Sequence, residues 1–424
     1  MNASDDPPAH FGELLRRLRS AKGMSQGELA RRVNYSKSHL SRVESGDKRP
    51  TSALARLCDN ALDVDGELLD YLQHHAHLSP AVVPSRFAQL PAATVSFTGR
   101  QDVLATLDDL LDRRARSESV IISGPPGVGK TALAVHWAYR VARRFAHGVL
   151  YSDLGGFDGE DDASPSAVLK GFLLALGVAP EAIPAGMSER AAAYRDLLAN
   201  RQVLVVLDNA ASVKQVRPLL AGSVGGSLVV MTSRLSLTGL TIREGARTIV
   251  LKEMGLDEAV QYVQSAVLDR RVVVSPVLAT RLAQLCECLP LALAIVVHRL
   301  SRAGDADAAH LVSLLERRST TLLDVLSISG DDSLSVRGSL WWSYRALSDP
   351  LSQALRLIST YAPNGIDVDE AASLLNVTSE VALTVLESLA AVNLIRPSDK
   401  RGYSCSPMVA TFVADLVSRP DLAS

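Results

Sequence analysis

The fold of this 424-residue chain is indicated first by the octapeptide Gly124-Pro125-Pro126-Gly127-Val128-Gly129-Lys130-Thr131. It matches the pattern G-x-x-x-x-G-K-S/T at every fixed position. The apolar residues 120–122 before it predict a buried strand, and residues 131–135 after it predict the start of a helix. A strand, a glycine-rich loop and a helix in this order are typical of a phosphate-binding loop.

The residue types of this loop suit the binding of a nucleotide. Glycine lets the backbone wrap around an anion, so that successive N–H groups and the helix N-terminus point at a phosphate. We expect Lys130 to reach the β- and γ-phosphates and the Thr131 hydroxyl to hold Mg²⁺. The alternative is a structural Gly/Pro turn. The expected ligands are ATP or ADP with Mg²⁺, and the expected binding residues of the loop are Gly124, Gly127, Val128, Gly129, Lys130, Thr131 and Ala132.

The charge of the chain is unevenly distributed. The composition, 47% hydrophobic and 21% charged, suits a globular protein of two to four domains. The net charge is −2, yet residues 10–60 hold eleven Lys or Arg against five acids, a net charge of +6. Such a basic region is expected of a segment that contacts phosphate backbones, although a solvated helical face would give the same count.

Neither a secretion signal nor a metal clip stands out in the sequence. The first eight residues are acidic and polar, and the longest apolar run, residues 289–297, contains Pro290 and is too short to span a bilayer. Cys286 and Cys288 are two positions apart, so they do not form a C-x-x-C motif. We therefore expect reduced cysteines, a cytoplasmic protein and no membrane partner.

Residues 11–78 have a helical pattern throughout. Gly23 ends a first helix, Ser25 is the expected cap of a second over residues 26–33, and Glu28 stands where a capping box needs it. A tight turn leads to a third helix over residues 36–45. Two short helices joined by a tight turn within a basic helical unit predict a helix-turn-helix.

Two stretches of this unit, Met24-Ser25-Gln26-Gly27-Glu28-Leu29-Ala30 and residues 36–46, closely resemble the Cro/C1-type (XRE) helix-turn-helix family. The resemblance implies an all-α domain that binds double-stranded DNA by placing its second motif helix in the major groove. Glu44 is expected to be structural, and a helical protein-binding module remains the alternative. The implied DNA contacts are Gln26 at a phosphate and Ser36, Lys37, Ser38 and Arg42 in the groove.

Further strands follow the phosphate loop. Residues 148–154, 202–209, 226–234 and 248–251 are apolar runs separated by helical segments, which predicts an α/β P-loop NTPase domain with a parallel sheet. Asp208 and Arg234 come at the carboxyl ends of two of these strands, where such sheets bind ligands. We expect Asp208 to orient Mg²⁺ opposite Thr131. A turn cap for Asp208 and a surface ion pair for Arg234 are the alternatives.

Five short motifs together resemble the NB-ARC branch of the STAND ATPases, over about residues 97–416. They are residues 98–100, the phosphate loop, residues 207–209, residues 232–234 and Leu289-Pro290-Leu291-Ala292-Leu293. The resemblance implies that Thr98 and Arg100 flank the adenine, that Pro290 packs near the base, and that Arg234 senses the γ-phosphate. With Lys130 and Asp208, Arg234 completes the expected catalytic set. A helical ARC domain and a winged-helix domain are implied to follow the sheet.

These patterns divide the chain into six parts. A helix-turn-helix followed by an NB-ARC-type ATPase domain resembles the bacterial regulators that combine these two modules. We expect a disordered tail (1–9), a helix-turn-helix domain (10–78), a linker (79–96), a P-loop domain (97–254), a helical ARC domain with a connector (255–336) and a winged-helix domain (337–424).

Three features depart from the family pattern. Cys405-Ser406-Pro407 stands where the family has Met-His-Asp, so the histidine that contacts the ADP β-phosphate is missing, and a tight ADP lock is not expected. Asn209 follows Asp208 where many active ATPases have an acid, so we expect slow hydrolysis at most. The sequence ends at Ser424 without a repeat array, so we expect the trigger to come from a separate sensor protein or from the nucleotide itself.

The function that these observations favour is a nucleotide-gated, DNA-binding transcriptional regulator. ADP/ATP exchange is expected to change domain packing and the assembly of a homo-oligomer, which would bring several weak DNA-binding units onto one DNA. The alternative is a defence or signalling ATPase whose helix-turn-helix makes protein–protein contacts. A metabolic P-loop kinase fits less well, because no acceptor-binding elements are evident and the later domains would have no role.

Overall fold

The chain folds as two units, residues 1–85 and 86–424, in a computed structural model. Their boundary falls inside the linker predicted at 79–96. The structure describes residues 11–33, 35–45, 50, 52–75, 89–93, 97–113, 118–156, 164–222, 225–268, 274–302, 305–316, 322–398 and 402–418. The predicted tail and residues 79–88 and 94–96 of the predicted linker lie outside the described residues.

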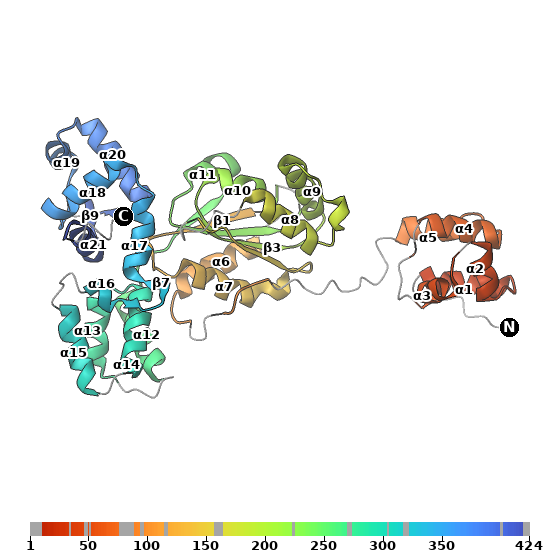
Figure 1. Cartoon of the computed structure of the whole chain (residues 1–424), viewed down its shortest axis with the longest axis horizontal. Helices are drawn as coiled ribbons and strands as arrows, with labels where there is room; N and C mark the ends of the chain where they lie inside the picture. Colours follow the sequence, from red (N-terminus) through yellow and green to blue (C-terminus); the bar gives the residue numbers. More distant parts are fainter. Residues whose placement is uncertain are drawn as a thin grey trace. The chain divides into compact units, whose positions relative to one another are not determined.

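The first unit is helical, which confirms the predicted helix-turn-helix (Figure 1). Ser25 and Glu28 form the expected capping box at the start of the second helix. Leu15, Leu29 and Leu40, from the first three helices, are buried in one core. The helices are α1 (Phe11–Ala21), α2 (Gln26–Arg32), α3 (Lys37–Glu44), α4 (Ser52–Leu62) and α5 (Glu67–His75).

Gly12 lets the first helix approach the third. A Cβ at this position would lie 2.2 Å from the Val43 carbonyl oxygen and 2.6 Å from that of Glu44, so no other residue fits without moving backbone. The same contact region holds an ion pair between Arg19 and Glu44, with Nε and Oε1 2.6 Å apart. The Gln26 amide also donates to Glu44, at 3.0 Å. Glu44 therefore joins α1, α2 and α3, in agreement with its expected structural role.

We expect Gly12→Ala to loosen this unit, because its methyl group meets fixed carbonyl oxygens of α3. The free energy needed to unfold residues 11–75 locally should fall by roughly 1–3 kcal/mol, the usual cost of overpacking. Hydrogen–deuterium exchange of peptides from residues 11–75 measures it in the full chain. Gly27→Ala is the matched control, since nothing lies within 4 Å of a Cβ there. Equal exchange protection in the two variants would contradict the close approach.

The second unit is built on a five-stranded sheet of order β2-β3-β4-β1-β5, in which every pair of neighbours is parallel. This confirms the predicted parallel sheet. Buried strand residues alternate between two cores, because successive side chains point to opposite faces. The strands are β1 (Glu118–Ser123), β2 (Val149–Asp153), β3 (Leu204–Ala210), β4 (Leu228–Ser233) and β5 (Arg247–Val250).

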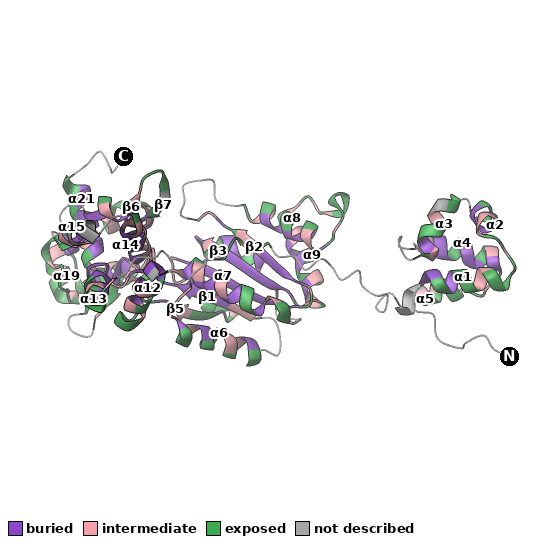
Figure 2. Ribbon diagram, turned by 90° about the horizontal axis from the view of Figure 1, so that it is seen from below, coloured by how far each residue is buried: buried purple, intermediate pink, exposed green. Residues whose placement is uncertain are grey.

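Helices cover both faces of this sheet (Figures 1 and 2). Val120, Val206 and Val230 pack with α6 and α7 on one face. Ile121, Val205 and Val229 pack with α8, α9 and α11 on the other. The helices of this part are α6 (Gln101–Arg113), α7 (Lys130–Val141), α8 (Pro165–Ala175), α9 (Met187–Ala199), α10 (Val213–Val216) and α11 (Thr238–Glu244).

The remainder of the chain is mainly helical. Its first group is α12 (Leu256–Leu268), α13 (Pro276–Leu285), α14 (Pro290–Arg302), α15 (Asp305–Glu316) and α16 (Leu322–Val325). A hairpin of β6 (Ser327–Ile328) and β7 (Asp331–Ser335), for which the sequence analysis gives no strand, leads to the second group. That group is α17 (Val336–Arg345), α18 (Asp349–Tyr361), α19 (Val368–Leu375), α20 (Ser379–Ala391), the antiparallel pair β8 (Ile395–Pro397) and β9 (Tyr403–Cys405), and α21 (Pro407–Ser418).

The four cysteines are free. Within the described ranges, no single helix is long and apolar enough to cross a membrane, and only the bent pair α19 and α20 meets the length and composition criteria jointly.

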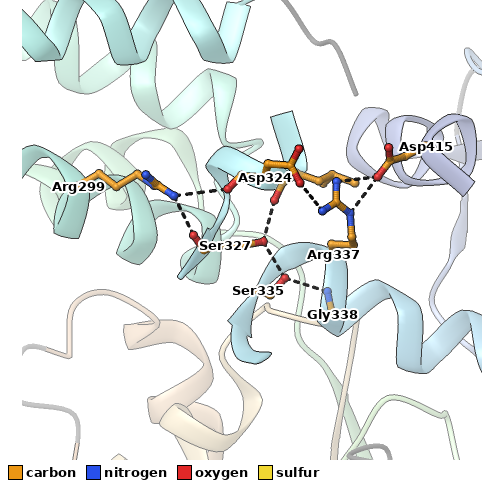
Figure 3. Close-up of polar contacts among 8 residues, drawn as sticks. Arg299, Asp324, Ser327, Ser335, Arg337, Gly338 and Asp415 are labelled. Atoms are coloured by element: carbon orange, nitrogen blue, oxygen red, sulfur yellow. Dashed lines mark hydrogen bonds and ion pairs between the residues drawn. The ribbon is translucent and has the colours of Figure 1, made fainter. Parts of the chain in front are cut away.

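A polar cluster joins the two helical groups (Figure 3). Arg337 of α17 pairs with Asp415 of α21, with Nη2 and Oδ2 2.7 Å apart, and also with Asp324 of α16. The Ser327 and Ser335 hydroxyls of the hairpin lie 2.8 Å apart. Since the Asp415 side chain is only 2% exposed, Arg337 supplies charge compensation to a buried carboxylate.

We expect Arg337→Ala to lower the free energy of unfolding of this unit by about 3 kcal/mol, because it removes a cation that pairs with the buried Asp415 carboxylate. Urea unfolding followed by tryptophan fluorescence measures it, since Trp341 and Trp342 lie in the same helix. Arg113→Ala is the control. Its ion pair with Asp109 is exposed, and its loss should cost less than about 1 kcal/mol. Equal urea midpoints for both variants would show that the cluster contributes no stability.

Candidate functional site

The phosphate loop lies between the end of β1 and the start of α7. Gly124, Gly127 and Gly129 have φ angles of 154°, 74° and 92°, a region that side chains disfavour. At Gly124 a Cβ would also lie 2.3 Å from the Leu251 carbonyl oxygen. Glycine is thus required here both for the turn and for the close approach of the chain after β5. The loop has the strand–loop–helix geometry that the sequence predicts.

Lys130 is folded into this loop and is only 8% exposed. Its Nζ donates to the carbonyl oxygens of Gly124 at 2.8 Å and Pro125 at 2.9 Å. Burial and the nearby Arg234 charge lower the pKa of Lys130 to about 7, and the Asp208 charge acts in the opposite direction. A bound phosphate would favour the charged form of the lysine, because opposite charge raises the pKa of an ammonium group.

Asp208 is the centre of a hydrogen-bonded group at the end of β3. The Thr131 hydroxyl donates to its Oδ1 at 2.9 Å, Thr232 of β4 donates to the same oxygen, and the Tyr151 hydroxyl donates to Oδ2 at 3.2 Å. Burial raises the pKa of Asp208, and the bonds from the two threonines oppose that shift. The structure therefore brings Thr131 and Asp208 together. Their hydroxyl and carboxylate oxygens are ligands of the kind that Mg²⁺ prefers.

Arg234 follows β4 and reaches the last helical group. Its Nη1 donates to the Ser339 carbonyl oxygen of α17 at 2.8 Å. Its own carbonyl oxygen accepts a bond from the Asn393 side chain at 2.7 Å. The charge of this guanidinium also contributes to lowering the pKa of Lys130.

Three of the other residues expected at the nucleotide, Arg100, Val128 and Pro290, lie in the loop or beside it. Arg100 is buried, and its guanidinium donates to the Val128 carbonyl oxygen at 3.3 Å. Thr98, two residues earlier, is half-buried. Pro290 begins α14 beside Gly129, and the next residue, Leu291, donates its backbone N–H to the Gly127 carbonyl oxygen at 3.1 Å. Val128 is buried in the loop, and Ala132 lies in the first turn of α7.

A cavity of about 580 Å³ opens beside the loop. Pro125 and Pro126 of the loop line it, together with Leu289 of the segment before α14. Leu340 of α17 also lines the cavity, as does Ser406, which stands at the position of the expected family histidine. Three successive parts of the second unit thus meet at the phosphate loop.

Two functional candidates were not anticipated by the sequence analysis, Tyr151 and Asp153 of β2. Tyr151 bonds to Asp208, and Asp153 accepts bonds from the Asn209 amide at 3.1 and 3.3 Å. The signal that could have found them is an acid and a hydroxyl at the carboxyl end of the strand that pairs with the Asp208 strand. Sequence alone does not give that pairing.

In the first unit, Lys37 and Arg42 are exposed on α3. Ser36 is the cap of this helix and accepts the backbone N–H of His39 at 3.1 Å. Gln26 is oriented towards α3 by its bond to Glu44. Ser38 lies in α3, but its side chain is outside the described residues.

Comparison with known proteins supports both modules. A helix-turn-helix domain model matches residues 10–72, and an AAA ATPase domain model matches residues 96–328. The regulatory protein AfsR of Streptomyces griseus is 35% identical over 379 residues, and that of Streptomyces coelicolor is 34% identical over 382 residues. Each match covers 88% of this chain but 37% of the relative, so the chain spans little more than a third of the relatives' length.

A solved structure agrees with the fold of the second unit. A Walker-type ATPase of Pyrococcus abyssi superimposes with a TM-score of 0.55 at 16% identity, covering 77% of this chain and 99% of that one. The ATPase domain model, which matches more than half of the residues, also shows the family. The chain therefore belongs to the AAA ATPase domain family, carries an N-terminal helix-turn-helix domain and is homologous to AfsR regulatory proteins.

Proposed function

We propose that this protein is a DNA-binding transcriptional regulator of the STAND class that is gated by ADP or ATP. The observation that carries the proposal is a pair of hydrogen bonds that link the sheet to both later parts. Leu291 of α14 bonds to Gly127 of the phosphate loop, and Arg234 at the end of β4 bonds to Ser339 of α17. A nucleotide that engages the loop and Arg234 would change the contacts of both later parts, and so would shift the equilibrium between their arrangements.

The nucleotide would be held by the chain's own groups in a defined way. The amides of residues 127–132 and the N-terminus of α7 would bind the phosphates, with Lys130 as their cation. Thr131 and Asp208 would hold Mg²⁺, which would neutralise charge on the phosphate oxygens. Thr98, Arg100 and Pro290 would flank the base. Ser406 offers a hydroxyl instead of the family's histidine, so we expect ADP to be held less tightly than in a locked switch.

The later parts would be the moving elements. Helices α12–α16 suit the role of an ARC domain within residues 255–336. Helices α18–α20 followed by the β8–β9 hairpin suit a winged-helix domain within residues 337–424. Movement of these parts away from the phosphate loop would expose surface through which protomers form a homo-oligomer.

The first unit would supply the DNA contact. Lys37 and Arg42 on α3 would bind double-stranded DNA in the cytoplasm, and assembly of several protomers would raise the avidity of individually weak contacts. A signal from a separate sensor protein, or the ATP/ADP ratio itself, would set the assembled fraction.

Lys130→Ala should lower nucleotide affinity at least about tenfold, because it removes a charged hydrogen-bond donor to phosphate. Fluorescent ADP and ATP analogues titrated into the full chain measure this, after the purified protein has been denatured to identify any nucleotide it carries. Lys170→Ala, at an exposed position of α8, is the control and should bind normally. Wild-type affinity in Lys130→Ala would contradict the assignment of the phosphate loop.

Arg42→Ala should weaken binding to duplex DNA and reduce the slope of log K against log salt by about 1, as expected for the loss of one phosphate contact. Fluorescence anisotropy with a labelled duplex, repeated with ADP and with ATP, measures both the contact and the gating. Arg56→Ala, exposed on α4, is the control. If Arg42→Ala leaves DNA affinity unchanged, the helix-turn-helix serves protein–protein contacts and the signalling alternative is favoured.

A further inference from the structure

Three neighbouring strands of the sheet carry polar residues at or near their carboxyl ends, on one face. In the parallel pairing of β2 with β3, Asp153 is the register partner of Asp208. Thr232, near the end of β4, donates to Asp208 from the next strand. Asp153, Asp208 and Thr232 therefore form a row across the carboxyl ends of β2, β3 and β4, which is the edge where the phosphate loop also lies.

The alternation of side chains places this row on the face covered by α7. Val206 and Val230, two residues before Asp208 and Thr232, pack in the core with α7, and so does Tyr151, two residues before Asp153. Because side chains two apart on a strand share a face, Asp153 projects on the same side as Asp208. The Tyr151 hydroxyl confirms this side by bonding to the Asp208 carboxylate at 3.2 Å.

Asn209 holds the Asp153 carboxylate in place. The β3–β4 register shifts between Leu207 and Ala210, and Asn209 has a φ angle of 54°. This irregularity redirects the Asn209 side chain, as β-bulges commonly do, so that its amide donates to both oxygens of Asp153. The Gly155 backbone N–H adds a third bond, at 3.0 Å. Asp153 remains exposed, so water has access to it.

Asn209 itself carries no carboxylate to orient a water molecule, although it directly follows the expected magnesium ligand. The structure supplies a carboxylate on the adjacent strand instead, bound by that same asparagine. We propose that Asp153 is the catalytic carboxylate of this ATPase domain, which orients the attacking water, and that Asn209 is its positioning residue. This inference rests on the proposed binding of Mg²⁺-ATP at the phosphate loop.

The reaction is hydrolysis of ATP to ADP and inorganic phosphate. The water oxygen, with one O–H donated to Asp153, forms the new bond to the γ-phosphorus, and the bond from that phosphorus to the β–γ bridging oxygen breaks. One proton of the water stays on the released phosphate and the other passes to solvent. Lys130, together with a Mg²⁺ ion held by Thr131 and Asp208, would compensate the charge on the phosphate oxygens.

The first test is Asp153→Asn in the full chain. Single-turnover hydrolysis of Mg²⁺-ATP should fall about 100-fold or more, the usual contribution of a positioned acid–base group. Affinity for a fluorescent ATP analogue, and for Mn²⁺ followed by its electron paramagnetic resonance signal, should stay within about threefold of wild type, because Asp153 is not expected to touch the phosphates or the metal. Asp196→Asn, exposed on α9, is the matched control and should change neither quantity.

The second test exchanges the two side chains. Asn209→Asp in the Asp153→Asn background restores one carboxylate and one amide with their positions reversed. If the carboxylate acts on water, this double variant should recover hydrolysis at least about tenfold over Asp153→Asn alone, whereas a merely structural pair would only regain its urea midpoint. Asn209→Ala should lower the rate with unchanged ATP affinity, since it releases Asp153 without removing it.

The outcomes separate the two proposals. Wild-type protein that binds ATP but does not hydrolyse it, or Asp153→Asn that hydrolyses at the wild-type rate, overturns the role of Asp153 and leaves the nucleotide gate intact. Loss of ATP or Mn²⁺ binding in Asp153→Asn makes Asp153 a binding group and also overturns it. Wild-type protein that binds no nucleotide overturns the proposed function itself.

Discussion

The second unit depends on how closely other backbone segments approach the phosphate loop. At Gly124 a Cβ would meet the Leu251 carbonyl oxygen at 2.3 Å, and at Gly127 it would lie 3.1 Å from the Leu291 side chain. The loop is thus packed against the chain that leaves β5 and against the start of α14, which leaves no room for a side chain at Gly124 and little at Gly127. Whatever moves the loop must move these two segments, because close-packed interiors transmit strain rather than absorb it.

The charges near the phosphate loop favour the binding of an anion. Lys130 is buried with only carbonyl oxygens as its described hydrogen-bond partners, and the Arg234 charge adds to the desolvation that lowers its pKa. Two cations near one buried loop disfavour each other, and phosphate would compensate both. Arg234 in turn donates to a carbonyl oxygen of α17. A phosphate bound in the loop would therefore act on the Arg234 charge as well as on Lys130. Through Arg234 it would also affect the hydrogen bond to Ser339 of α17.

The sequence predicts local features of this protein well. The capping box of Ser25 and Glu28, the phosphate loop between a strand and a helix, and the placement of Asp208 and Arg234 at strand ends all follow from neighbouring residues. The features that it does not predict are contacts across large separations. Arg234 and Ser339 are 105 residues apart, and Asn209 and Asp153 are 56 apart. Such pairs depend on strand order, register and a bulge in β3, none of which has a local pattern.

Asn209 stands where many active ATPases have an acid, and its hydrogen bonds to Asp153 suggest what it does there. Judged along its own strand, Asn209 replaces an acid with a group that cannot accept a proton. Judged across the sheet, it is a donor that holds an acid from β2 at the same edge. A carboxylate on the edge strand β2 that is held by a neighbouring side chain is less firmly fixed than one on β3 itself, because its position depends on a second residue. Under the proposed function, slow hydrolysis would let bound ATP persist long enough for protomers to meet on DNA, since the lifetime of the ATP form would set the time available for assembly.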